Sequence, residues 1–131
     1  MISMCVLMNH RMTESQIEDA VNALKVEKFI FPPENLQKIW EQIPADNEDI
    51  LDIVEPVLQW LLDNSNEGDY IFVQGDFGAT LLVVSWAFKH DRIPVYSTTQ
   101  RKYESTINEK GEVVNVHTFK HVRFRRYRMI Q

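Results

Sequence analysis

A glycine turn between two apolar segments is the part of this chain best suited to chemistry. It reads Gln74, Gly75, Asp76, Phe77, Gly78, Ala79 and Thr80. The run 69–73 before it is typical of a buried strand, and the run 81–88 after it is long enough for a buried helix. Such a turn can expose backbone N–H groups that bind a phosphate. It can equally be a plain strand-to-helix turn, with glycines at positive φ and Asp76 as the N-cap.

The turn has neither of the two common nucleotide-binding signatures. It lacks the G-x-G-x-x-G pattern of dinucleotide sites and the G-K-[ST] ending of a Walker loop. The turn therefore leaves phosphate binding and a purely structural role equally open.

Two other predicted strands, residues 2–8 and 93–97, are followed by polar side chains. These side chains are Asn9, His10 and Arg11 after the first strand, and Thr98, Thr99 and Arg101 after the second. In open α/β sheets, ligands bind outside the carboxyl ends of the strands. Amide, hydroxyl, imidazole and guanidinium groups gathered at that edge suit an anion that carries a sugar and a base. Each loop is weak evidence alone, but all three are predicted to converge.

The C-terminal segment 119–127 carries a dense run of basic residues. A strand with a period of two places His121, Arg123 and Arg125 on one face, with Phe124 on the other. The sequence thus predicts a basic face at one edge of the sheet.

Two roles fit this basic strand. Charge on an edge strand protects a sheet from aggregation, and this role is favoured for Arg126 and Arg128. A position beside a ligand or across a dimer interface is favoured for Lys120, His121 and Arg123.

Apolar periodicity predicts strands alternating with helices along the first hundred residues. The predicted strands cover residues 2–8, 27–31, 69–73 and 93–97. Two predicted helices begin near residues 13 and 33, and two more cover residues 47–63 and 81–89. Thr13 and Gln16 form a capping box. The apolar stripe of that first helix is Ile17, Ala20, Val21 and Leu24.

Beyond residue 100 the pattern changes to a β-hairpin, 103–108 and 112–118, and a last strand from 119 to about 128. Strand–helix alternation predicts an α/β fold with a mostly parallel sheet flanked by helices. The hairpin would extend it as a C-terminal antiparallel addition. We expect a single domain over 1–131, with the α/β part at 1–99 and the hairpin and basic strand at 100–131.

Composition and charge exclude several classes of function. The 131 residues are 44% hydrophobic and 25% charged, as in soluble globular proteins. The sequence shows no segment that could span a bilayer and no signal peptide. Cys5 is the only cysteine, and no histidine or carboxylate cluster has metal-ligand spacing, so we expect a buried thiol in the cytoplasm, no metal and no cofactor.

Charge is divided unevenly along the chain. Residues 1–91 carry a net −11 and residues 92–131 a net +6, within a total of −5. Such an acidic protein is not expected to bind duplex DNA, which requires a broad basic face. A local basic pocket could still hold a small polyanion.

Five motifs resemble the CRISPR-associated Csx family of type twenty and span nearly the whole chain. They are Asn9-His10-x-x-Thr13-x-x-Gln16, Ile43-Pro44, Gln74-Gly-Asp-Phe-Gly-Ala-Thr80, Tyr96-Ser-Thr-Thr99-x-Arg101 and Phe119-Lys-His-Val-Arg-Phe-Arg125-x-Tyr127. The resemblance implies a Rossmann-like domain similar to the CARF domains of type III CRISPR systems. It also implies cyclic oligoadenylate as ligand, with cyclic tetra-adenylate as the expected ring, and ring-nuclease cleavage that switches off type III signalling.

The residues suggest how such cleavage would proceed without a metal. A ribose 2′-OH would attack the adjacent phosphate and leave a 2′,3′-cyclic phosphate, with positioning and charge stabilisation supplying the rate. The candidate catalytic residues are His10 and Arg101, then Lys120 and His121. The candidate ligand-binding residues are Asn9, Arg11, Gln74, Gly75, Asp76, Phe77, Gly78, Ala79, Thr80, Thr98, Thr99 and Arg123. The rotational symmetry of the ring favours a two-fold homodimer.

Two alternatives remain open from the sequence. The chain could be a non-catalytic module that senses or sequesters the same messenger. It could also be a nucleotide-binding protein unrelated to CRISPR.

Overall fold

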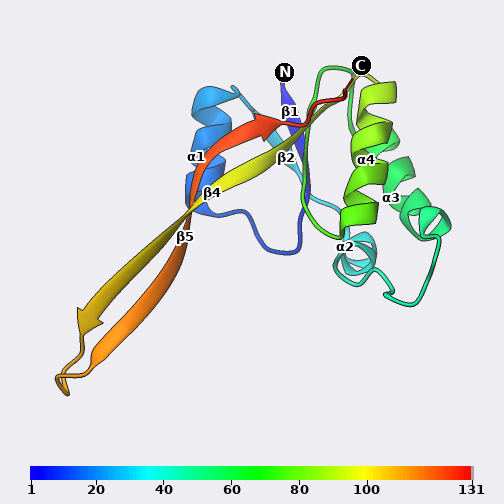
Figure 1. Cartoon of the computed structure of the whole chain (residues 1–131). Helices are drawn as coiled ribbons and strands as arrows, with labels where there is room; N and C mark the ends of the chain where they lie inside the picture. The colour runs from blue at the N-terminus through cyan, green and yellow to red at the C-terminus, as the bar shows by residue number, and fades with distance from the viewer. Residues whose placement is uncertain (131) are drawn as a thin grey trace.

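Within residues 1–130, which the computed structural model describes, five strands form one sheet in the order β2-β1-β3-β4-β5 (Figure 1). The strands are β1 (Ser3–Leu7), β2 (Lys28–Ile30), β3 (Tyr70–Val73), β4 (Ile93–Ile107) and β5 (Val113–Arg126). The first four pair in parallel and β5 pairs antiparallel to β4. The predicted α/β fold, with a mostly parallel sheet and an antiparallel C-terminal extension, is confirmed.

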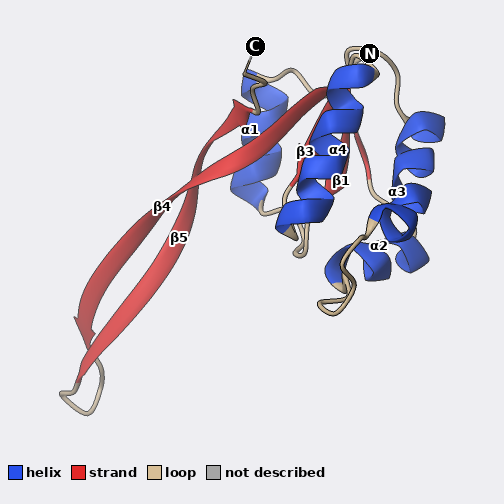
Figure 2. Ribbon diagram, turned by 45° about the vertical axis from the view of Figure 1, so that its right-hand side comes forward, coloured by secondary structure: helices blue, strands red, loops and turns tan. Residues whose placement is uncertain are grey.

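Helices cover both faces of the sheet (Figure 2). They are α1 (Glu14–Ala23), α2 (Glu34–Glu41), α3 (Leu51–Asn64) and α4 (Phe77–Lys89). One hydrophobic cluster joins Ala20 of α1 to Met4, Phe72 and Val95. The other cluster joins α2, α3 and α4 to the opposite face of β1 and β3. Among the described residues, no helix is both long and apolar enough to cross a membrane.

Local signals set where the helices begin. Thr13 caps α1 and forms the predicted capping box with Gln16. Helix α3 begins at Leu51 rather than at residue 47, and Pro56 lies inside it. Helix α4 begins at Phe77 rather than near residue 81, so the second half of the glycine turn is the first turn of the helix.

Helix α1 is rotated relative to the prediction. Gln16 and Ala20 are its buried residues, whereas Ile17 and Val21 are 37% and 44% exposed. The predicted apolar stripe was therefore wrong at these two positions. In this orientation Asp19 faces β5, and its Oδ2 lies 2.7 Å from Nε2 of His121.

The predicted fourth strand and the first hairpin strand are one continuous strand, β4, and the last two predicted strands are likewise one, β5. Beyond Thr98 the two strands leave the sheet together as a two-stranded arm, residues 99–122 (Figure 1). Unbroken pairing from Thr99 to Ile107 explains the continuity, because the polar residues between the predicted strands also pair.

A β-bulge at the base of the arm changes which side chains share a face. Thr98 pairs with Arg123 and Thr99 with His121, so Val122 is an extra residue on β5. The bulge brings the rings of His121 and Phe124 to the same face, 4.8 Å apart. The predicted grouping of His121 with Arg123 and Arg125 was therefore wrong, because simple alternation does not survive a bulge.

Tyr127 fastens the end of β5 to the centre of the sheet. Its hydroxyl donates to the carbonyl of Val73 at 2.7 Å, and its ring lies 4.7 Å from that of Tyr96. Burial raises the pKa of Tyr127 from 10.0 to about 12.

Tyr127→Phe should therefore give a pH-dependent loss of stability. At neutral pH we expect the free energy of unfolding to fall by about 1 kcal/mol, because one hydrogen bond is lost. The protonated hydroxyl stabilises the fold fully below the unfolded pKa of 10.0, and this contribution is lost as the pH rises through about 12. Urea unfolding of both proteins should show the deficit of the variant shrinking above pH 10. A deficit that stays constant would show that Tyr127 ionises normally.

Candidate functional site

The connections that follow two neighbouring strands of the sheet, β1 and β3, lead to opposite faces of the sheet. From β1 the chain continues through α1 on one face, and from the neighbouring β3 it continues through α4 on the other. In doubly wound sheets a crevice opens where such connections diverge, outside the carboxyl ends of the strands. Here a small crevice of about 160 Å³ is lined by Met8, Asn9, His10, Gln74 and Gly75. The loops after the first and third strands thus meet as the sequence suggested.

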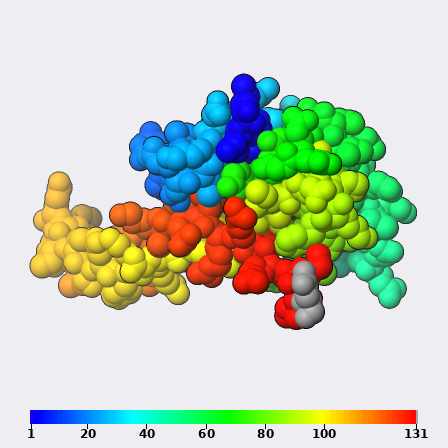
Figure 3. Space-filling view, turned by 90° about the horizontal axis from the view of Figure 1, so that it is seen from above, coloured from blue at the N-terminus to red at the C-terminus, as the bar shows by residue number. Residues whose placement is uncertain are grey.

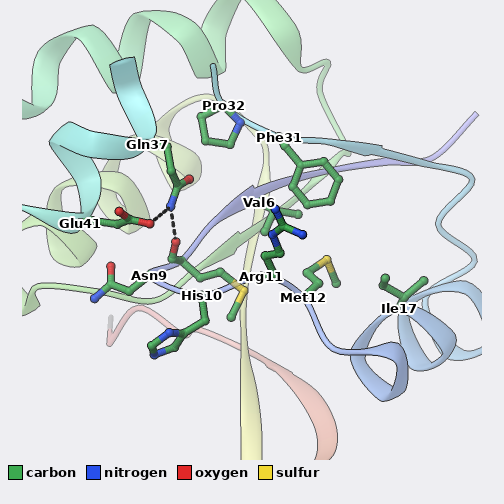
Figure 4. Close-up of a pocket in the computed structure, with 11 residues that line it drawn as sticks. Val6, Asn9, His10, Arg11, Met12, Ile17, Phe31, Pro32, Gln37 and Glu41 are labelled. Atoms are coloured by element: carbon green, nitrogen blue, oxygen red, sulfur yellow. Dashed lines mark hydrogen bonds between the residues drawn. The ribbon is translucent and has the colours of Figure 1, made fainter. Parts of the chain in front are cut away.

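A larger pocket of about 550 Å³ adjoins the crevice and shares Met8, Asn9 and His10 with it. Figure 4 shows its other side chains, which include Arg11, Met12, Phe31 and Gln37. Phe31 is 55% exposed, so its ring is available as an apolar wall. The two hollows together have a size and a mixture of polar and apolar groups typical of small-molecule sites.

The loop that links β1 to α1 is held at both ends. Gln37 of α2 donates from Nε2 to the carbonyl of Met8 at 2.8 Å and to Glu41 at 2.9 Å (Figure 4). At the other end Thr13 caps α1. Between these anchors Asn9, His10 and Arg11 are exposed, and their side chains make no hydrogen bond to any described residue. Their polar groups are therefore available to a ligand.

Gln74 connects the crevice to β4 and to α2. Its Oε1 accepts a hydrogen bond from the backbone N–H of Ser97 at 2.6 Å, which fixes the side chain at the crevice. Its carbonyl accepts from Trp40 Nε1 at 3.0 Å. The amide of Gln74 keeps its NH₂ group as a donor at the crevice.

Gly75 is required by the packing of Trp40. A Cβ at Gly75 would lie 2.8 Å from Trp40 Nε1 and 3.0 Å from its Cε2, closer than side-chain carbons approach one another. Neither Gly75 nor Gly78 has a positive φ. The expected conformational reason for these glycines was wrong, because a close approach explains Gly75 instead.

The start of α4 is a poor phosphate site. The carboxylate of Asp76 accepts from the N–H of Ala79 at 2.9 Å and so occupies the position that an anion would take. On its other side Gly78 borders a hollow lined by Glu48 and Asp49. The structure thus shows the N-cap alternative for Asp76. Phe77 is 95% exposed, Ala79 is buried, and the buried hydroxyl of Thr80 has no partner among the described residues.

The remaining predicted residues lie away from both hollows. Thr98 and Arg123 bond to each other across the base of the arm, Thr98 Oγ1 donating to the Arg123 carbonyl at 3.0 Å. Thr99, Arg101 and Lys120 belong to the arm. The guanidinium of Arg101 lies 5.7 Å from the ring centre of Phe119 on the neighbouring strand. Within one chain none of these five residues lines the pocket or the crevice.

His121 is held by two partners and has little contact with solvent. Its Nδ1 lies 2.6 Å from Ser97 Oγ and its Nε2 2.7 Å from Asp19 Oδ2, and its side chain is 4% exposed. A neutral ring that donates to Asp19 accepts from Ser97. The order Asp–His–Ser is that of hydrolytic triads. Because Ser97 is buried and lines neither hollow, the three residues connect α1 to β4 and β5 instead.

Several residues of this region were missed from the sequence. Phe31 and Pro32 follow β2, which is also a parallel strand, so the rule applied to the other strands would have found them. Ser97 and Asp19 gave no such signal, because Asp19 is 102 residues from His121. Among the described residues, no group of three or more histidine, cysteine or acidic side chains could hold a metal ion.

Comparison with known proteins gives a family. The model of the "Uncharacterized protein MJ1673 family" matches residues 2–125. The chain is 41% identical over 127 residues to "Uncharacterized protein MJ1673" of Methanocaldococcus jannaschii, an alignment that covers 97% of this chain and 98% of that protein. No solved structure matches the chain. The chain belongs to the MJ1673 family.

Substituting the two glycines tests whether Gly75 is required by its packing against Trp40. Gly75→Ala should lower the free energy of unfolding by about 1–3 kcal/mol, because its methyl group displaces the Trp40 indole. Gly78→Ala is the matched control: its Cβ would meet atoms at 3.4 Å, an ordinary contact, and alanine favours a helix by about 0.5–1 kcal/mol. Urea unfolding measures both variants. Equal stabilities would contradict the role assigned to Trp40.

Proposed function

We propose that this member of the MJ1673 family binds cyclic oligoadenylate at the carboxyl edge of its sheet and cleaves it without a metal ion. The observation that carries the proposal is the pocket of about 550 Å³ and its adjoining crevice between β1 and β3, where Asn9, His10 and Arg11 present unengaged polar groups beside an apolar wall. The activity would be that of a ring nuclease that switches off type III CRISPR signalling.

The arrangement of the sheet supports a nucleotide ligand. The four parallel strands follow the order β2-β1-β3-β4, with helices on both faces. This is the order of doubly wound nucleotide-binding folds, whose ligands lie at the divergence of two neighbouring strands. We therefore propose that the fold is Rossmann-like and of the CARF type, as the resemblance in five motifs implies.

The lining of the pocket matches the parts of an adenylate. Phe31, Met12 and Ile17 offer apolar surface on which a base can stack. The guanidinium of Arg11 suits a phosphate, since its planar fork can contact two oxygens. Amide groups of Asn9 and Gln74 lie at the crevice and suit the polar edge of a base or a ribose hydroxyl.

The same residues suggest how a phosphodiester bond would be cleaved. The 2′-oxygen of one ribose attacks the adjacent phosphorus, the bond to the 5′-oxygen breaks, and a 2′,3′-cyclic phosphate and a 5′-hydroxyl result. His10 would take the 2′-proton or supply a proton to the leaving oxygen, since an imidazole ring can both accept and donate a proton. Arg11 would stabilise the charge that develops on the phosphate oxygens. Arg11 replaces Arg101 in this role, because Arg101 lies on the arm.

Comparing two histidines tests the proposed chemistry. In single-turnover reactions with labelled cyclic tetra-adenylate and EDTA, the wild-type protein should form a product ending in 2′,3′-cyclic phosphate. His10→Ala should slow this step by about 10²–10⁴-fold without changing the melting temperature. His121→Gln, the matched control, should lower the melting temperature and leave the rate per folded molecule unchanged.

Three outcomes would contradict the proposal. Tight binding without cleavage would make the protein a binding module for the messenger. Activity that EDTA abolishes and magnesium restores would exclude the metal-free mechanism. A His10→Ala variant of normal rate would remove His10 from the reaction.

A further inference from the structure

The arm formed by residues 99–122 projects away from the rest of the molecule (Figures 1 and 3). In the space-filling view its yellow and orange atoms extend to one side of the body. Four of its large apolar side chains are 59–75% exposed: Tyr103, Ile107, Val113 and Phe119. A two-stranded hairpin is at best marginally stable alone in water, and exposed apolar surface of this kind marks an interaction site.

The register of the arm places these four residues on one face. Arg101 pairs with Phe119, Tyr103 with His117, and Ile107 with Val113. These six residues are termed the apolar arm face. The polar pair between them, Ser105 and Asn115, satisfies itself through a side-chain hydrogen bond of 2.9 Å. A partner could therefore cover this face and leave the hydrogen bond between Ser105 and Asn115 intact.

The opposite face of the arm is more polar. It presents Lys102 beside Thr118 and Glu104 beside Val116. Apart from Val122 in the bulge, which is 56% exposed, its large apolar residues are Val114 and Val116, at 38% and 40%, against 68% for Val113 on the apolar arm face. The arm is thus amphipathic, and one face is suited to be covered.

At its base, the apolar arm face continues the side of the sheet that α1 covers. His121 lies two residues along β5 from Phe119, the β5 residue of that face closest to the base, and bonds to Asp19 of α1. On its outer surface α1 exposes Ile17 and Val21 together with Glu14 and Glu18. The charged group of the apolar arm face is Arg101, which is basic. The two surfaces are therefore complementary in apolar content and in charge.

These complementary surfaces cannot meet within one chain, because the arm leads away from α1 beyond its base (Figure 1). We propose that the apolar arm face packs against α1 of a second copy of this chain. A two-fold axis allows both arms to do so at once, since each copy presents the same two surfaces on the same side. The proposal shares Ile17 with the pocket of about 550 Å³ but does not require the proposed function.

The charge of the whole chain favours the same partner. Residues 1–91 carry a net −11 and residues 92–131 a net +6. Most of this positive charge lies outside the arm, because residues 99–122 carry four Lys or Arg and three Glu, a net +1. The C-terminal part as a whole is attracted to the acidic body of another copy, which orients the encounter. An unrelated acidic protein would satisfy the charge but would not supply the apolar residues of α1.

Two substitutions at adjacent positions test the role of the apolar arm face. Light scattering of the full chain should report twice the chain mass of 15.5 kDa. Phe119→Asp should reduce the mass to that of one chain, whereas Thr118→Asp, which lies on the opposite face, should leave the dimer intact. Circular dichroism should show both variants folded. A monomeric wild-type protein, or equal effects of the two substitutions, would overturn the proposal.

A second pair of variants tests whether α1 is the docking surface. Glu14→Lys combined with Glu18→Lys should raise the dissociation constant of the dimer by at least about tenfold, because like charges would then face Arg101. Glu48→Lys combined with Asp52→Lys makes the same change in net charge near α3 and should have little effect. An unchanged dissociation constant in the α1 variant would overturn α1 as the partner of the arm.

Discussion

The pairing of β1 with β3 is the constraint on which the rest of the molecule depends. Both strands are buried along their whole length, and their register from Met4 with Tyr70 to Leu7 with Val73 fixes where each one ends. The segment after β1 leads to one face of the sheet and the segment after β3 to the other. Neither segment therefore covers the edge between the carboxyl ends of these two strands. The crevice and the adjoining pocket follow from this divergence, so the candidate site is a consequence of the topology.

Contacts from neighbouring elements then determine the chemistry that this edge can offer. Trp40 packs against Gly75 and bonds to the carbonyl of Gln74, which holds the end of β3 close to α2. Asp76 uses its carboxylate on its own helix and so removes α4 as an anion site. The positive charge at the site therefore comes from Arg11 in the first loop. The glycine turn supplies shape, and the β1 loop supplies the exposed polar groups Asn9, His10 and Arg11.

Sequence periodicity predicted the parallel part of the fold well, since buried strands and amphipathic helices have distinct spacings. It also predicted that the loops after β1 and β3 would meet. Other features depend on contacts between distant residues and leave no local signal. The alternation of side chains along a strand does not show that Val122 is an extra, bulged residue. The residues around Asp19 likewise give no sign that it bonds to His121. The hairpin at the end of the arm was predicted, but its continuity with the predicted strand 93–97 was missed, because polar residues around Arg101 are typical of a loop, yet they pair as a strand.

We propose that the ligand binds where β1 and β3 diverge. Titrating the isotope-labelled protein with cyclic tetra-adenylate, with EDTA present, and following backbone amide resonances by NMR tests this directly. We expect the largest shifts on Asn9, His10, Arg11 and Gln74, with small shifts at the far end of the sheet around Arg126. Shifts confined to Arg126 and its neighbours, or no shifts at all, would contradict it.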